Sequence, residues 1–141
     1  MDDQSKIAEF LAGSPFAVVG ASRSRHKYGN KVLRCYSQHN RTVYPVNPAA
    51  TSVEGLTCYT DLTCLPGPVH GVSVITPPGV TERIVEKLSA SGARWVWMQP
   101  GAESDRAIAR AEAAGVGVIA GGPCLLVALG FREDGQVPDD D

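Results

Sequence analysis

Residues 16–29, FAVVGASRSRHKYG, form the stretch of sequence that decides the fold. Four apolar residues followed by Gly20 are typical of a strand buried on both faces of a parallel sheet. A polar loop comes next, and the residues from about Asn30 to Gln38 have the apolar spacing of a helix. A buried strand, a glycine-led loop and a helix in this order predict the start of an α/β domain.

Strand-like and helix-like segments alternate along the rest of the chain. Further strands are expected at residues 42–46, 72–75, 95–98 and 116–119, and helices at 5–12, 81–91 and 104–114. Residues 49–70 are expected to be irregular, with a short helical turn near Asp61. The alternation predicts a Rossmann-type fold, a doubly wound parallel sheet of about five strands with helices on both faces.

A chain of 141 residues is long enough for one such domain. We expect the domain to span residues 14–130, with residues 1–13 forming a helix that packs on it. The last ten residues carry five acids, so residues 131–141 are expected to form an acidic disordered tail. No apolar run is long enough to cross a bilayer, and no signal-peptide core follows the polar N-terminus. We therefore expect a cytoplasmic protein with no membrane partner.

The charges and the cysteines exclude several classes of function. Residues 16–60 carry six basic side chains against one acid, although the net charge of the chain is −2. This asymmetry favours a local site for a polyanion and not a surface that binds nucleic acid. The four cysteines have no C-x-x-C spacing and no histidine beside them, so no metal site is expected. Most of them should be buried thiols, with Cys124 as the exception.

Small, polar or proline residues follow all five predicted strands. Right-handed crossovers bring the carboxyl ends of parallel strands to one edge of the sheet, where α/β proteins bind their ligands. The sequence therefore predicts a binding crevice at this edge. Its residues after the successive strands are Gly20, Ala21, Ser22, Arg23 and Ser24; Asn47 and Pro48; Thr76, Pro77 and Pro78; Gln99, Pro100 and Gly101; and Gly121, Gly122, Pro123 and Cys124.

The loop after the first strand has the chemistry of a phosphate site. Ser22 and Ser24 offer hydroxyl groups, and the N-terminus of the next helix favours an anion. Arginine forks and a lysine suit phosphate oxygens, and residues 23–27 contain two arginines, a histidine and a lysine. The G-x-G-x-x-G fingerprint and the Walker motif are both absent, and no acid follows the second strand. These absences disfavour NAD and ATP as ligands.

Catalytic machinery is not visible in the sequence. Neither the histidines nor the acids form a triad, a metal cluster or a general acid–base pair at a strand end. The residues therefore predict a binding protein without catalytic residues of its own.

Several motifs resemble those of the CoA-binding domain family. The resemblance rests on residues 18–22, on Tyr28 and Gly29, on residues 43–48, 76–78 and 97–101, and on Gly122-Pro123-Cys124, and it covers about residues 14–128. The family's domain also forms the N-terminus of the succinyl-CoA synthetase alpha subunit and of related acyl-CoA synthetases.

The resemblance implies a role for each motif. Gly20, Ala21, Ser22, Arg23 and Ser24 would hold the pyrophosphate of CoA, and the nearby Arg25 and Lys27 its 3′-phosphate. Val46, Asn47, Pro48, Thr76, Pro77 and Pro78 would line the adenine and ribose, and Gln99, Pro100 and Gly101 the pantetheine arm. Cys124 would lie near the end of that arm, either as a buried structural thiol or as a residue that forms a mixed disulfide with CoA.

The expected function is to bind CoA or a short acyl-CoA without catalysis, as a carrier, sensor or partner subunit, with a homodimer or an enzyme subunit as protein partner. Synthetase alpha subunits have a second domain with a phosphorylated histidine, and this sequence shows none, so acyl-CoA formation by the chain alone is not expected. Two alternatives stay open. One is a small NADP-dependent reductase or an acyl-CoA-handling enzyme completed by another chain, and the other is a scaffold with an empty crevice.

Overall fold

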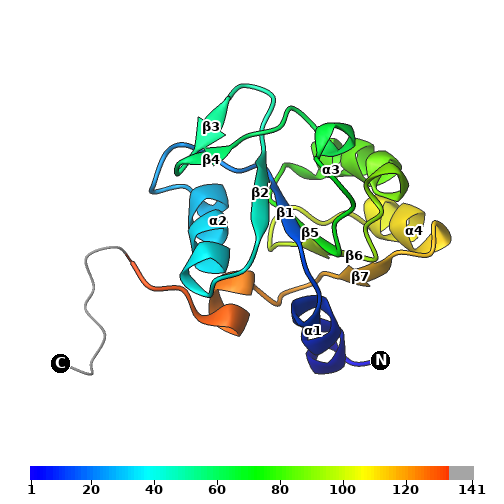
Figure 1. The fold of residues 1–141 in the computed structure, drawn as a ribbon. Coiled ribbons are helices and arrows are strands. Elements are labelled where there is room, and N and C mark those ends of the chain that lie inside the picture. Colours follow the sequence, from blue (N-terminus) through cyan, green and yellow to red (C-terminus); the bar gives the residue numbers. More distant parts are fainter. Residues whose placement is uncertain (134–141) are drawn as a thin grey trace.

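A five-stranded parallel sheet with the strand order β2-β1-β5-β6-β7 forms the centre of the fold (Figure 1). The computed structural model describes residues 1–133. The strands are β1 (Phe16–Val19), β2 (Val43–Val46), β5 (Gly71–Val74), β6 (Trp95–Met98) and β7 (Gly117–Ile119). The predicted Rossmann-type α/β fold is confirmed.

Helices cover both faces of this sheet (Figure 1). On one face lie α1 (Asp3–Ala12), α2 (Tyr28–Gln38) and a π-helical segment, Leu126–Gly130. On the other lie α4 (Asp105–Ala113) and α3 (Pro78–Ile84), which continues as two 3-10 turns, Val85–Lys87 and Ser89–Ser91. Among residues 1–133, no helix combines the length and the apolar character needed to cross a membrane.

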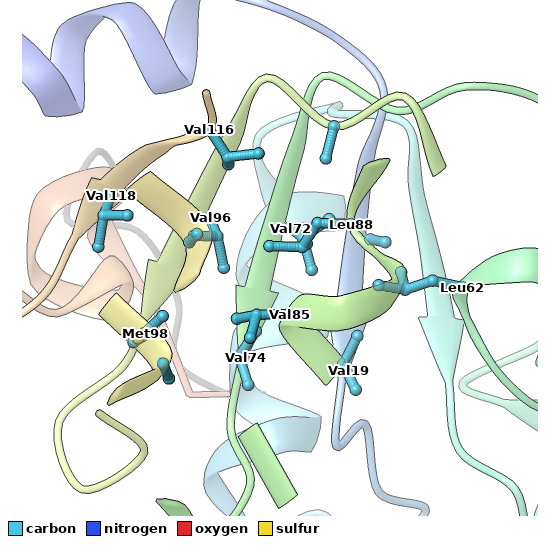
Figure 2. Close-up of a cluster of buried hydrophobic side chains, with 14 of the residues drawn as sticks. Val19, Leu62, Val72, Val74, Val85, Leu88, Val96, Met98, Val116 and Val118 are labelled. Carbon is cyan, nitrogen blue, oxygen red and sulfur yellow. The ribbon is translucent and has the colours of Figure 1, made fainter. Parts of the chain in front are cut away.

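Successive strand residues contribute to opposite layers of the core, because side chains alternate across a strand. Val72, Val74, Val96 and Met98 pack beneath α3 and α4, in the cluster that Figure 2 shows. Trp97 points the other way and joins the cluster beneath α1 and α2. Nearly every residue of the five strands is buried, which is why their sequences are runs of apolar residues without a polar face.

The structure differs from the sequence-based expectations in two segments. The α-helix expected at residues 81–91 begins at Pro78, since proline is well accommodated in the first turn, and its second half is 3-10 helical. Within the segment expected to be irregular, β3 (Ser52–Val53) and β4 (Leu56–Thr57) form a hairpin. Its turn residues Glu54 and Gly55 both have positive φ, 51° and 78°, as a type I′ turn requires.

Specific hydrogen bonds hold two further segments outside the sheet. The helical turn expected near Asp61 is the 3-10 helix η1 (Leu62–Cys64), which Asp61 caps through the Thr63 amide at 2.7 Å. Residues 131–133, expected to begin a disordered tail, instead lie against α2, where the backbone of Arg132 and the side chain of Gln38 exchange two hydrogen bonds of 2.6 and 2.9 Å. The rest of the expected acidic tail, residues 134–141, lies outside the described residues.

Candidate functional site

The carboxyl ends of β1, β2 and β5 lie side by side, at the point where the strand order reverses. The strand register pairs Val19 with Val46 on one side and with Val74 on the other. The loops that follow these strands leave the sheet in opposite directions, which opens a crevice between them. Gly20, Asn47 and Thr76, predicted from three separate motifs, meet at this crevice.

A cavity of about 300 Å³ occupies the crevice. Apolar, polar and charged side chains all line it. Sequence reasoning anticipated Gly20, Val46, Asn47, Pro48 and Thr76. The other lining residues are Val19, Thr60, Asp61, Leu62, Val80, Arg83, Ile84 and Lys87.

Arg83 and Lys87 bring positive charge to this cavity. They are four residues apart on α3 and the turn after it, so they share one side of the helix. Lys87 Nζ lies 3.4 Å from a carboxylate oxygen of Asp61, which also lines the cavity. Arg83 makes a 3.4 Å contact with the Gly79 carbonyl of its own helix and no ion pair within residues 1–133. Both are exposed, and in the sequence they looked like part of a solvent-facing polar side.

Two glycines hold the loop after β1 close to its neighbours. Gly20 has a φ of 97°, and a Cβ atom there would lie 2.4 Å from the Ile75 carbonyl oxygen. A Cβ atom on Gly29 would lie 2.0 Å from the Gly20 carbonyl oxygen. Residues with side chains would therefore push the loop away from both β5 and α2.

Hydrogen bonds from outside the loop fix its backbone. The side-chain amide of Asn47 donates to the Ala21 carbonyl at 2.7 Å, and that of the buried Asn30 donates to the Ser22 carbonyl at 2.8 Å. Within the loop, the Ser24 amide donates to the Ser22 hydroxyl at 3.0 Å. The loop therefore holds its shape through partners in β2 and α2, which reduces the ordering needed when a ligand binds.

The basic residues of the loop have different surroundings. Arg25 makes a two-pronged contact with the Glu54 carboxylate, at 3.1 and 3.2 Å, which ties the loop to the β3–β4 hairpin. The hydrogen bond from Asn30 and the contact with Arg25 lower the pKa of Glu54. Within residues 1–133, neither Arg23 nor Lys27 pairs with a carboxylate, and both are exposed beside the first turn of α2. In the described part of the chain, no side-chain hydrogen bond from Lys27, the N-cap residue, closes that turn.

Gln99 and Cys124, predicted after β6 and β7, lie apart from the cavity, in a second cluster. Gln99 is fully buried, and its Oε1 accepts hydrogen bonds from the Tyr28 hydroxyl at 3.0 Å and the Leu125 amide at 2.9 Å. The same Tyr28 hydroxyl contacts the Cys124 Sγ. Burial raises the pKa of the Tyr28 phenol well above its usual range. The predicted residues Pro77, Pro78, Pro100 and Gly101 are exposed and do not line the cavity.

Residues 1–133 contain no group of three or more His, Cys, Asp or Glu side chains arranged to hold a metal ion. Cys35 and Cys58 are buried as expected, but the expectation fails for Cys64, which is exposed in the 3-10 helix η1. Cys124, the expected exception, is half-buried. The arrangement as a whole suits an elongated anionic ligand that carries an apolar or aromatic group.

Comparison with known proteins places this geometry in context. A family model described as "CoA binding domain" matches residues 14–130. Among curated proteins, an ADP-forming acetate–CoA ligase of Methanocaldococcus jannaschii is 23% identical over 78 residues, which are 55% of this chain and 11% of the relative. A second such ligase, of Archaeoglobus fulgidus, is 31% identical over 71 residues, 50% and 10% of the two chains. The chain thus spans about a tenth of the length of the curated relatives that it matches.

Solved structures agree over more of the chain. A hypothetical protein from Pyrococcus horikoshii OT3 has a TM-score of 0.84 and 28% identity, covering 90% of this chain and 89% of its own. A Thermus thermophilus protein has a TM-score of 0.82 and 27% identity, covering 90% and 96%. An acetyl-coenzyme A synthetase of Ca. Korarchaeum cryptofilum has a TM-score of 0.70 at 24% identity over 79% of this chain and 26% of its own, a likeness of fold alone.

Proposed function

The chain belongs to the CoA-binding domain family, and from this premise we propose that it binds coenzyme A or a short acyl-CoA along the carboxyl edge of its sheet. The observation that carries the proposal is the cavity at the β1/β5 switch point, next to a fixed glycine loop and the open N-terminus of α2. CoA combines a nucleotide, a pyrophosphate and a long thin arm, and the edge offers a matching feature for each.

The pyrophosphate belongs at the loop of residues 20–24. The first turn of α2 directs its amides and the positive end of the helix dipole towards this loop, a combination that stabilises phosphate groups. Arg23 and Lys27 stand beside it without a carboxylate partner in the described part of the chain. Arg25 contributes less to phosphate binding, because its guanidinium already forms two hydrogen bonds with the Glu54 carboxylate.

The adenosine belongs in the cavity. A volume of about 300 Å³ is at the lower end of ligand pockets, which run from roughly 300 to 1,000 Å³, so it suits one part of CoA and not the whole molecule. Val46, Pro48 and Ile84 offer apolar walls for an adenine ring. Arg83 and Lys87 supply the positive charge that a phosphate on the ribose requires.

The end of β2 favours CoA over a nicotinamide dinucleotide. A dinucleotide site of the Rossmann type usually holds its ribose with an acid at this position. Here the residue is Asn47, and its amide is engaged with the Ala21 carbonyl. The pantetheine arm would then pass Gln99, Pro100 and Gly101 towards Cys124.

We further propose that the chain acts as a cytoplasmic CoA carrier or sensor, or as a partner subunit, without catalysis of its own. The named function of the curated relatives supports the partner-subunit version, since they are ligases that use CoA and are about ten times longer than the matched region. In that version another chain catalyses the reaction, and this chain binds the CoA that the reaction uses.

Thermal-shift titration with four ligands tests the proposal. CoA is expected to raise the Tm, by an amount that corresponds to about 2.7 kcal/mol at a concentration one hundred times its Kd. Dephospho-CoA should raise it less, and NADP and NAD hardly at all. A larger shift with NADP would favour a reductase, and no shift with any nucleotide would mean an empty scaffold. Native mass spectrometry of the same samples would report bound CoA and the number of subunits.

A further inference from the structure

Three side chains from distant segments meet at the far end of the sheet edge. Tyr28 is the first residue of α2, Gln99 follows β6, and Cys124 follows β7. The Tyr28 hydroxyl contacts both the Gln99 Oε1, at 3.0 Å, and the Cys124 Sγ. We refer to these three residues as the thiol cluster.

The direction of the hydrogen bonds in the thiol cluster follows from the number of donors. The Leu125 amide donates to the Gln99 Oε1 at 2.9 Å, which identifies that atom as the amide oxygen and not the nitrogen. The Tyr28 hydroxyl has one proton and gives it to the same oxygen. Cys124 then donates its S–H proton to the Tyr28 oxygen.

One group in the thiol cluster lacks a partner. The Gln99 side chain is fully buried, and its Nε2 has no acceptor among residues 1–133. If the side-chain amide were flipped by 180°, Nε2 would face the Leu125 N–H, and two hydrogen-bond donors would be opposed. Buried amide groups without an acceptor are rare in folded proteins. The unpaired N–H groups of Gln99 therefore point to an acceptor that a ligand supplies, such as a carbonyl oxygen.

The spacing of the sheet suits the arm of CoA. Two strands separate β1 from β7, so their ends lie about 14 Å apart at roughly 4.8 Å per strand spacing. The arm from the pyrophosphate to the CoA thiol has about twelve bonds, as many as four extended residues, which span about 13–14 Å. With the pyrophosphate at the loop after β1, the CoA sulfur would reach the thiol cluster.

The nearest carbonyl of CoA also falls at the right place. The last amide carbonyl of the arm is about four bonds from the sulfur, little more than the span of one residue. Gln99 and Cys124 share the Tyr28 hydroxyl, so they are about as close to each other. A CoA sulfur at Cys124 would therefore bring that carbonyl within reach of the Gln99 Nε2.

We propose that Cys124 captures CoA by thiol–disulfide exchange, with Gln99 Nε2 donating a hydrogen bond to the terminal amide carbonyl of the arm. This rests on the proposed function. The Cys124 sulfur, after losing its proton, attacks the CoA sulfur of a CoA disulfide, CoA–S–S–R. The S–Cys124 bond forms as the S–S bond breaks, and R–S⁻ leaves and takes up a proton. One disulfide replaces another, so no separate oxidant is needed, and a free thiol reverses the step.

Intact-protein mass spectrometry with CoA disulfide as the probe tests this capture. The expected result is one CoA-sized adduct per chain, removed by DTT and mapped to Cys124. Cys64 is an internal control, because it is exposed but lies outside the thiol cluster. Oxidised glutathione is the control disulfide and should modify Cys124 at least tenfold more slowly than CoA disulfide does. Cys124→Ser should abolish the adduct, and Cys64→Ser should keep it.

A second variant tests the role of Gln99 separately. Gln99→Met keeps the length of the side chain but removes both its N–H groups and the Oε1 that accepts from Tyr28 and Leu125. The ratio of the adduct rate with CoA disulfide to the rate with oxidised glutathione should fall about tenfold, the effect of the one hydrogen bond that only CoA would receive. The rate with oxidised glutathione reports any change in the reactivity of Cys124 that loss of Oε1 causes through Tyr28. Equal rates for both disulfides, an adduct mainly on Cys64, or a Cys35–Cys124 disulfide instead of an adduct would each overturn the proposal.

Thermal-shift titration of Cys124→Ser with reduced CoA separates this inference from the proposed function. If reduced CoA stabilises the variant but CoA disulfide leaves no adduct on the parent protein, only the capture is wrong. If reduced CoA stabilises neither protein, the proposed function fails as well.

Discussion

The side-chain amide of Asn47, at the end of β2, donates a 2.7 Å hydrogen bond to the carbonyl oxygen of Ala21, in the loop after β1. Its other atom, Oδ1, accepts from the Ala49 amide at 2.8 Å. The position therefore requires a donor and an acceptor on one short side chain. An aspartate, the usual acid of a dinucleotide site, could accept from Ala49 but would place negative charge against the Ala21 carbonyl.

Replacing Asn47 by Asp should consequently loosen the loop. We expect Asn47→Asp to lower the free energy of unfolding by about 1–3 kcal/mol, because a buried acceptor loses its donor. Affinity for CoA should fall with it, and affinity for NAD should not rise. Urea unfolding and calorimetric titration measure the two effects. The control is Gln4→Glu, an amide-to-acid change on the exposed side of α1, and an equal loss in both variants would contradict the assignment.

Replacing Gly29 by Ala should displace the loop directly. The added methyl group would lie 2.0 Å from the Gly20 carbonyl oxygen, so either the loop or α2 has to shift. Steric overpacking of this kind typically costs about 1–3 kcal/mol of stability. Gly79→Ala is the matched control, since a methyl group on this first-turn residue of α3 meets nothing within 4 Å. Thermal unfolding with and without CoA should show a loss for Gly29→Ala only.

Replacing Arg83 and Lys87, the two cations of the cavity, should reduce the preference for CoA over dephospho-CoA. We expect Arg83→Ala with Lys87→Ala to weaken CoA binding at least tenfold, because a hydrogen bond to a charged group contributes about 1.5–3 kcal/mol. Dephospho-CoA, which lacks the ribose phosphate, should bind the double variant and the parent about equally. Calorimetric titration of both ligands measures the difference, with Arg106→Ala on the exposed side of α4 as control. An equal loss for both ligands would assign these side chains to another part of CoA.

The contacts of Glu54 make a prediction about acid stability. The hydrogen bond from Asn30 and the charge of Arg25 lower the pKa of Glu54 below its ordinary value of 4.5. The folded state therefore binds this proton less readily than the unfolded state does. The resulting stability is fully present above about pH 4.5 and disappears as the pH falls through the lowered pKa.

Glu54→Gln removes this charge and tests the acid prediction. The variant should be less stable than the parent at pH 7, and the difference should shrink at pH 3, as urea unfolding at the two values would show. Glu112→Gln, on an exposed part of α4 with no ion pair in the described chain, should change stability similarly at both. If Glu54→Gln is as much less stable than the parent at pH 3 as it is at pH 7, the Glu54 side chain stabilises the fold by its shape and not by its charge.

Much of the site could be predicted because it follows directly from the strands. Gly20 and Asn47 come immediately after β1 and β2, Thr76 is the second residue after β5, and parallel strands bring such residues to one edge of the sheet. Arg83 and Lys87 could not be found in this way. They look like the solvent side of an amphipathic helix, and only the packing of α3 beside the switch point places them at the cavity.

The hairpin at residues 52–57 was missed for a local reason. Asparagine, aspartate or glycine usually occupies the first turn position of a type I′ hairpin, and here it is Glu54 with a φ of 51°. This unusual residue places its carboxylate against Arg25 and Asn30. A loop arginine predicted to hold phosphate thus has a carboxylate partner that the sequence did not reveal.

Local sequence was sufficient for the five strands of the main sheet, their order along the chain and their parallel arrangement, because apolar periodicity depends on neighbours a few residues apart and crossovers have one hand. The partners of the functional side chains depended on the folded molecule. Arg25 and Glu54 are 29 residues apart, Tyr28 and Gln99 71, and Tyr28 and Cys124 96. Which of these groups meet is decided by where each loop leaves the sheet and how the helices pack across it, and no pattern within a single segment contains that information.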